Sequence, residues 1–282
     1  MASDKVENNF QSYLYCQEKM EPILEVKNLC MDFGGLRALD RLELDVRQGE
    51  IVALIGPNGA GKTTFFNCIT GIYNPTEGDI LIHSPKKEAG ERINGLKPNQ
   101  VTEKGMARTF QNIRLFPNMT VLENVMIGRH CRTSSGITGA VFRGRKTVEE
   151  EKTLVADSYS ILEKIGLEKF VNDLAKNLPY GAQRRLEIAR GMATEPFLLL
   201  LDEPAAGMNP QETKELDDLV VEIRDHEGIS ILLIEHDMKL VMSLSDRIFV
   251  MDYGKKIAQG KPEEIKNNPA VIKAYLGEET DA

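Results

Sequence analysis

The chain has 282 residues, 28% of them charged, and a formal net charge of −8. This acidic balance argues against a nucleic acid as the main binding partner. The longest apolar runs are far shorter than a bilayer span, so any membrane role is expected to be peripheral. The four cysteines are widely separated and form no Cys-x-x-Cys pair, which predicts reduced thiols and neither a disulfide frame nor a metal site.

Strand-like patterns begin after a polar lead. Residues 1–21 are weakly patterned, and we expect them to form a flexible extension. Apolar or alternating residues then predict strands at 23–26, 42–46, 51–55 and 79–82. A turn at residues 32–35 carries Phe33, and the ordinary place for a phenylalanine near strands is the core.

A glycine-rich stretch comes directly after the predicted strand 51–55 and before a helix-like segment. Its glycines let successive backbone N–H groups point at phosphates, and the following helix adds its positive N-terminus. Lys62 would reach the terminal phosphates, and Thr63 would offer a hydroxyl to Mg²⁺. The sequence therefore predicts a nucleoside triphosphate site made by Gly56, Pro57, Asn58, Gly59, Ala60, Gly61, Lys62, Thr63 and Thr64.

Two acids follow a second apolar run, at residues 196–201, which is typical of a parallel strand buried on both faces. Ligands of open α/β sheets bind at the carboxyl ends of strands. Asp202 would therefore hold Mg²⁺, and Glu203 would polarise the attacking water. An isolated Asp-Glu pair would favour a solvated turn, but the phosphate loop in the same chain favours catalysis.

A third apolar run, at residues 229–234, ends in Glu235, His236 and Asp237. A single histidine is usually structural or superficial. Here the preceding strand belongs to the same predicted sheet, so the imidazole can approach the same ligand edge. It would contact the γ-phosphate and hold the attacking water and Glu203 in register.

Residues from about 112 to 178 have a helical character. Thr120 and Glu123 form a predicted capping box, and residues 148–165 carry apolar positions at mostly helical spacing. Between them, residues 130–146 are rich in Gly, Arg, Ser and Thr and are expected to be a solvated loop. The α/β pattern resumes after Gly181, with a helix at 186–194, the strand ending at Asp202, and a helix from Gln211.

Six elements occur in the order of an ABC-type ATPase, and the chain resembles that family: the phosphate loop, Gln111, the helix-opening residues 178–182, the acid pair, residues 206–209 and His236. The resemblance covers roughly residues 22–277. It implies an α/β fold with a RecA-like P-loop core, an antiparallel β subdomain and an inserted helical subdomain. The expected parts are the extension 1–21, the first part of the core with the β subdomain at 22–111, the helical subdomain at 112–181, the second part of the core at 182–257, and tail helices at 258–282.

The same resemblance implies that two ATPases close head to tail around two ATP molecules. Phe33 would stack on adenine, Gln111 would sense Mg²⁺ and the γ-phosphate, and Glu203 would act as the base. The metal ligands would be Thr63, Gln111 and Asp202, with ATP and Mg²⁺ as the cofactors. The signature residues that act on the ATP of the partner subunit would be Tyr180, Gly181, Ala182 and Gln183.

Longer stretches, at residues 33–36, 183–190, 205–207, 233–238 and 268–277, are similar to the branched-chain amino-acid uptake subfamily. This implies a bacterial importer with two membrane permeases, a second ATPase and a periplasmic binding protein for leucine, isoleucine or valine. The chain would lie on the cytoplasmic face of the inner membrane. Residues 114–117 would contact a permease or merely pack as a loop. The alternatives are an amide or urea importer, a lipopolysaccharide exporter whose ATPase pairs with itself, and a soluble ABC ATPase without permeases.

Two positions depart from the common ABC pattern. The usual signature begins Leu-Ser-Gly-Gly-Gln, whereas this chain has Pro179, Tyr180 and Ala182 in place of the serine, the first glycine and the glutamine. Proline has neither a hydroxyl nor an N–H to donate, so the ATP site of the partner is expected to turn over more slowly. Asn209 replaces an aspartate, which keeps hydrogen bonding but removes a charge.

Overall fold

The computed structural model describes residues 22–85, 87, 89–132 and 145–276. The expected extension 1–21 and Cys16 lie outside the described residues, as do most of the expected loop at 130–146 and the end of the tail. In the part of the chain that the structure describes, Cys30, Cys68 and Cys131 form no disulfide. Among the described residues, no helix has the length and apolar character that crossing a membrane requires.

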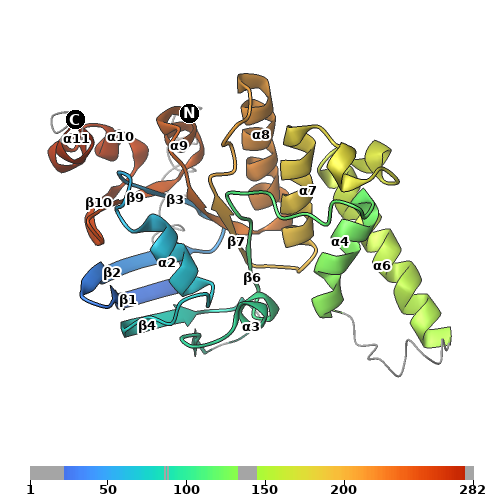
Figure 1. The fold of residues 1–282 in the computed structure, drawn as a ribbon, viewed down its shortest axis with the longest axis horizontal. Helices are drawn as coiled ribbons and strands as arrows, with labels where there is room; N and C mark the ends of the chain where they lie inside the picture. Colours follow the sequence, from blue (N-terminus) through green and yellow to red (C-terminus); the bar gives the residue numbers. More distant parts are fainter. Residues whose placement is uncertain (1–21, 86, 88, 133–144, 277–282) are drawn as a thin grey trace, which may run out of the picture.

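A six-stranded sheet forms the centre of the molecule, with strand order β10-β9-β3-β8-β7-β6 (Figure 1). Neighbouring strands from β9 to β6 are parallel, and β10 is antiparallel to β9. The strands are β3 Ile51–Ile55, β6 Met106–Arg108, β7 Leu198–Asp202, β8 Ser230–Ile234, β9 Arg247–Asp252 and β10 Lys255–Gly260.

Every residue of β3, β7 and β8 is buried, because apolar side chains on both sheet faces are covered. In β3, Ile51, Ala53 and Ile55 pack into the core on the side of the helices. Val52 and Leu54 pack into a second core, which the six-stranded sheet shares with a smaller sheet. The uninterrupted apolar runs of the sequence therefore reflect burial on both faces.

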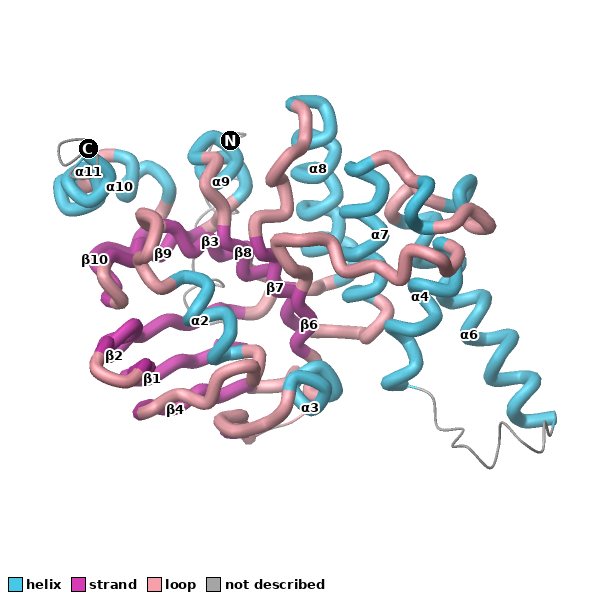
Figure 2. The backbone as a smooth tube through the Cα atoms, viewed as in Figure 1, coloured by secondary structure: helices cyan, strands magenta, loops and turns pink. Residues whose placement is uncertain are grey.

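The smaller sheet is antiparallel, in the order β2-β1-β4-β5. It comprises β1 Pro22–Phe33, β2 Leu36–Arg47, β4 Glu77–Ile82 and β5 Glu91–Arg92. Helix α2, Lys62–Ile69, lies between the two sheets, as Figure 2 shows. Its Phe65 and Phe66 are fully buried in the second core and join the two layers.

Helices α8, Pro210–Glu227, and α9, Met238–Leu244, cover the other face of the six-stranded sheet (Figure 1). Beside the sheet stand α4 Val121–Arg129, α6 Arg145–Lys164 and α7 Tyr180–Met192. The other helical elements are α3 Pro98–Glu103, α10 Pro262–Lys266, α11 Pro269–Leu276, η1 His130–Arg132, η2 Glu168–Phe170 and η3 Ala175–Asn177.

Two predicted boundaries are wrong. The expected loop at 130–146 contains η1 at its start, and α6 already begins at Arg145, because arginine and lysine favour a helix before the first apolar position. Helix α7 begins at Tyr180, within the expected helix-opening residues 178–182, with Pro179 at its N-cap, and it ends at Met192, before the predicted end at residue 194. The predicted capping box of α4 is present, since Thr120 Oγ1 accepts from the Glu123 N–H at 3.2 Å.

Candidate active site

The phosphate loop leaves β3 through backbone conformations that only glycine adopts easily. Gly56 has φ 152° and Gly61 has φ 100°. A Cβ atom at Gly56 would lie 2.1 Å from the Met251 carbonyl oxygen. No side chain caps the start of helix α2. The N–H groups of its first turn can therefore bind an anion.

Lys62 lies over this loop. Its Nζ donates to the carbonyl oxygens of Gly56 at 2.6 Å and Pro57 at 2.9 Å, and the residue is buried. The ammonium therefore sits against the backbone that would cradle phosphates. Thr63, the next residue, is exposed on the first turn of α2.

Glu203 stands at the carboxyl edge of the sheet between two polar side chains. Its Oε2 accepts from Gln111 Nε2 at 2.7 Å, and its Oε1 lies 2.9 Å from His236 Nε2. The Glu203 N–H also donates to the Ile234 carbonyl at 2.9 Å, which joins the ends of β7 and β8. The structure thus brings together the three predicted catalytic residues, which are up to 125 positions apart in the sequence (Gln111 to His236).

Asp202 has a partner that sequence reasoning missed. Arg108 Nη2 lies 2.7 Å from Asp202 Oδ2, and both side chains are less than a tenth exposed. The Arg108 guanidinium also donates to Asn67 and Thr70 and lies over the rings of Phe66 and Phe110. The sequence shows an arginine three positions before Gln111. Its contact with Asp202 depends on the pairing of β6 with β7 and could not be read from the sequence.

Glu235 is a second residue whose contacts were not predicted from the sequence. Its Oε1 accepts from the Ala205 N–H at 2.8 Å, and its Oε2 accepts from the His236 N–H at 3.1 Å. Burial raises the pKa of this carboxyl above its ordinary value. Glu235 therefore supports the backbone on both sides of the Glu203–His236 contact.

Phe33 lies at the end of β1 and is 41% exposed, so it is not a core residue. Its ring contacts the Tyr73 ring edge-to-face, with 5.3 Å between the centroids. An exposed aromatic face of this kind suits stacking on a base. Stacking on adenine stays a prediction.

The signature residues lie at the start of α7. The Tyr180 hydroxyl donates to the Ala206 carbonyl at 2.9 Å, and Gln183 Nε2 donates to the Leu178 carbonyl at 2.9 Å. Gly181 and Ala182 are buried and line a cavity of about 310 Å³ with Pro179. Action on the ATP of a partner subunit stays a prediction for these residues.

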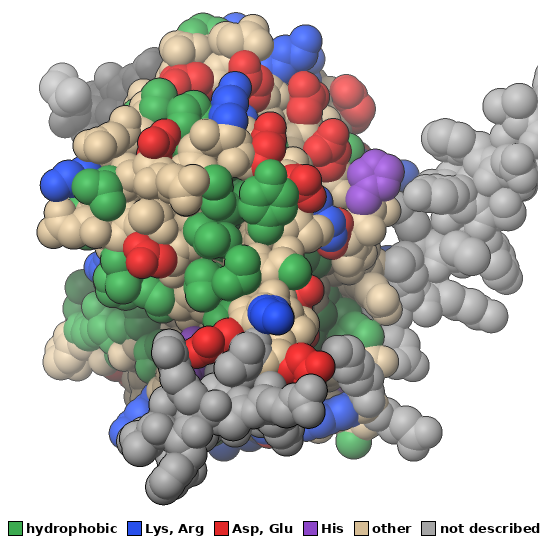
Figure 3. All heavy atoms as spheres, turned by 90° about the vertical axis from the view of Figure 1, so that its right-hand side faces the viewer, with side chains coloured by type: hydrophobic (Ala, Val, Ile, Leu, Met, Phe, Trp, Pro, Cys, Tyr) green, Lys and Arg blue, Asp and Glu red, His purple; other side chains and the backbone are tan. Residues whose placement is uncertain are grey.

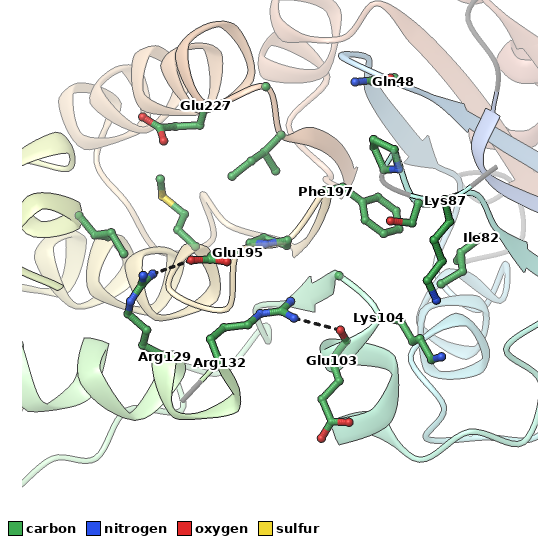
Figure 4. A pocket seen from close by; sticks show the side chains of 18 of the residues that line it. Gln48, Ile82, Lys87, Glu103, Lys104, Arg129, Arg132, Glu195, Phe197 and Glu227 are labelled. Carbon is green, nitrogen blue, oxygen red and sulfur yellow. Dashed lines mark hydrogen bonds and ion pairs between the residues drawn. The ribbon is translucent and has the colours of Figure 1, made fainter. Parts of the chain in front are cut away.

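A larger cavity, of about 940 Å³, lies elsewhere, at the amino ends of β6, β7 and β8 (Figure 4). Several of its charged side chains form hydrogen bonds or ion pairs within it. Arg129 Nη1 lies 3.0 Å from Glu195, and Arg132 donates to the Glu103 carbonyl at 3.2 Å (Figure 4). It contains none of the predicted site residues.

A glycine-rich loop between a buried strand and a helix, with an acid pair at the end of a parallel strand in the same sheet, defines a P-loop ATPase. Residues 39–206 match the family model for ABC transporters, and residues 255–281 match a model described as a branched-chain amino acid ATP-binding cassette transporter. The chain belongs to the ATP-binding subunits of ABC transporters, which bind nucleotide and hydrolyse ATP to drive transport.

Several proteins are similar over nearly their whole length. The chain is 50% identical to the high-affinity branched-chain amino acid transport ATP-binding protein LivG of Salmonella typhimurium over 258 residues, covering 92% of this chain and 99% of the relative. It is 48% identical to BraF of Pseudomonas aeruginosa, which carries the same description, over 257 residues, covering 91% and 98%. A crystal structure of an ABC-transporter ATP-binding cassette in its ADP conformation superposes with a TM-score of 0.78 at 31% identity, covering 91% of this chain and 99% of that one.

Proposed function

We propose that this chain is the ATP-hydrolysing subunit of an importer for branched-chain amino acids. The observation that carries the substrate class is the match of residues 255–281, which lie beyond the ATPase segment, to a model specific to branched-chain amino acid cassettes. The names of the similar proteins LivG and BraF support the same class.

Nucleotide would bind through the loop backbone and Lys62, whose ammonium already lies over the loop. The oxygen donors of Thr63, Asp202 and Gln111 fit Mg²⁺, which prefers hard oxygen ligands and takes one or two carboxylates together with phosphates. When bound, the ion would neutralise charge on the phosphates. Among the described residues, no cluster of three or more His, Cys, Asp or Glu side chains suggests another metal.

Glu203 is the proposed base. Gln111 and His236 each hold one of its carboxylate oxygens, which fixes the direction in which the carboxylate accepts a proton from water. An orienting contact of this kind acts on kcat more than on nucleotide binding.

Two permeases and a second ATPase are the proposed partners. Large apolar side chains that are at least a third exposed gather in the helical part of the chain, at Phe116, Met119, Ile127, Val155 and Tyr159. Figure 3 shows hydrophobic side chains on this face, between scattered acids. Such a surface suits a protein partner, and it adjoins the candidate permease contact at residues 114–117. The chain would accordingly lie on the inner face of the membrane.

The test is uptake of labelled leucine in cells that lack this chain and receive the native sequence, Glu203→Gln or Glu222→Gln. The last variant makes the same substitution on α8, away from the site. The native chain and Glu222→Gln should restore uptake, and Glu203→Gln should not. Failure of the expressed native chain to restore leucine uptake, with uptake of an amide or urea restored, would overturn the substrate class.

The signature of this chain would complete the ATP site of the partner subunit. Pro179 stands at its start and has no donor for a phosphate, so we propose that the partner site is the slower one. In the reconstituted transporter, Glu203→Gln should then remove most ATP turnover. Retention of most turnover would contradict this asymmetry.

A further inference from the structure

Helix α7 carries a fully buried ion pair one turn from the signature. Arg184 Nη1 lies 2.9 Å from Glu187 Oε2, and the two side chains are 0% and 1% exposed. Burial raises the pKa of Glu187 above its ordinary value. A buried pair of this kind costs desolvation and often contributes less stability than apolar packing would, so its role must be sought in the geometry that it imposes.

Both members of the pair bind the backbone of the segment that carries Gln111. Arg184 donates to the Phe110 carbonyl at 2.6 Å and to the Gln111 carbonyl at 2.7 Å. Glu187 Oε1 accepts from the Phe110 N–H at 3.4 Å and from the Arg114 N–H at 3.2 Å. Side chains from one helix therefore hold residues 110–114 at both carbonyl and N–H groups.

This segment has no strand or helix of its own to position it. Strand β6 ends at Arg108, and α4 begins only at Val121. The side chain of Gln111 must nevertheless meet Glu203 at 2.7 Å. The contact to Glu203 is thus made from an irregular segment whose backbone is held by α7.

We propose that Arg184 and Glu187 are positioning residues for ATP hydrolysis: they form a clamp that holds Gln111 against Glu203. The inference rests on the proposed roles of Gln111 and Glu203. The contacts of the clamp are with the backbone of residues 110–114, whereas the loop backbone and Lys62 would bind the phosphates. The clamp therefore acts on the hydrolytic step more than on nucleotide affinity.

The principal test is a double-variant cycle on ATP turnover by the full-length chain in its reconstituted transporter. Arg184→Lys keeps the positive charge beside Glu187 but lacks the planar fork that reaches two carbonyls. It should lower kcat about tenfold and change the KM for ATP much less. Arg185→Lys, the same substitution at the next and partly exposed position, should leave both values unchanged.

The cycle is completed in a Gln111→Ala background. If the clamp acts through Gln111, adding Arg184→Lys there should cause no further loss of kcat. Losses that multiply, or a native kcat in Arg184→Lys, would overturn the proposal.

A second measurement needs no turnover. Hydrogen exchange of residues 110–114 in the isolated full-length chain should speed up about tenfold in Glu187→Gln, because the Phe110 and Arg114 amides lose a charged acceptor. Native exchange rates in that variant would overturn the clamp. A native chain without ATP turnover would instead count against the proposed function. The exchange rates would still show whether Glu187 holds residues 110–114.

Discussion

At the scale of single residues, the candidate site has backbone strain at its proposed base. Glu203 has φ 47°, a left-handed conformation that costs a non-glycine residue about 1 kcal/mol. Its N–H bond to Ile234 and its contacts with Gln111 and His236 hold it there. This left-handed conformation turns the chain immediately after Asp202. The two consecutive acids therefore contact different partners, Arg108 for Asp202 and Gln111 and His236 for Glu203.

Arg108 is predicted to stabilise the fold through Asp202. Arg108→Met would leave a buried carboxylate without its cation and should lower the free energy of unfolding by about 3 kcal/mol. Urea unfolding measures this loss. Arg92→Met breaks the exposed pair with Asp79 and should cost no more than about 1 kcal/mol, so equal losses in the two variants would contradict the prediction.

Asp217 makes stability depend on pH. Burial is the main cause that raises its pKa from 3.8 to about 6, and the carboxylates of Asp218, Asp237 and Glu235 add to the shift. Its Oδ1 is buried without a hydrogen-bond partner among the described residues. Folding disfavours the charged form of Asp217. Its contribution to the free energy of unfolding is therefore fully present below the unfolded pKa near 3.8, and this contribution is lost as the pH rises through about 6.

Asp217→Asn should therefore raise the free energy of unfolding at about pH 8 by about 1 kcal/mol, a value reduced for partial exposure, and the gain should vanish near pH 4. Urea unfolding across this range, with Glu222→Gln on the same helix as the control, checks it. A gain that does not depend on pH would be contrary to the assignment.

At the scale of elements, α4 and α7 approach each other closely at a glycine. A Cβ at Gly128 would lie 2.3 Å from the Arg190 carbonyl oxygen and 3.2 Å from the Ala193 Cβ. The first contact is with backbone and cannot be relieved by a side-chain rotation. The spacing of these helices matters because α7 carries both the signature and the clamp.

Gly128→Ala should destabilise the chain, although alanine favours a helix by about 1 kcal/mol over glycine. Overpacking costs about 1–3 kcal/mol, and the backbone contact places this site at the upper end, so we expect a net loss of about 2 kcal/mol. Thermal or urea unfolding would show it. Gly35→Ala, where a Cβ meets nothing within 4 Å, is the control, and an equal change there would refute the packing argument.

At the scale of the whole molecule, α2 joins two sheets and also begins at the proposed nucleotide site. Phe65 and Phe66 are buried between the sheets, while Lys62 and Thr63 at the start of the same helix face the phosphate loop or solvent. Nucleotide binding at this helix is thereby coupled to the stability of both layers.

ATP should stabilise the native chain by about 2.7 kcal/mol at a hundred times its Kd, measured as a rise in Tm. Glu203→Gln should keep this rise because it binds nucleotide but does not hydrolyse it. Lys62→Ala should remain folded without ATP but lose most of the rise, whereas Lys27→Ala, at an exposed lysine, should keep it. A full rise in Lys62→Ala would exclude its role in binding phosphate.

The sequence by itself determined the local chemistry of this protein. The strand, glycine-rich loop and helix at 51–69, the acids at the end of β7 and the histidine after β8 follow from local patterns. Burial on both faces and phosphate binding each demand particular residues in consecutive positions. The resemblance of these motifs, in their order, also indicated the family to which the comparisons assign the chain.

Only the tertiary structure decided which distant residues meet. Arg108 contacts Asp202, which is 94 positions away in the sequence, and Arg184 contacts Phe110, which is 74 positions away. Strand order and helix packing bring these residues together. No local periodicity encodes such contacts. The start of α6 at Arg145 was missed for a different, local reason, since the intrinsic helix propensity of arginine and lysine extends this helix beyond its apolar stripe.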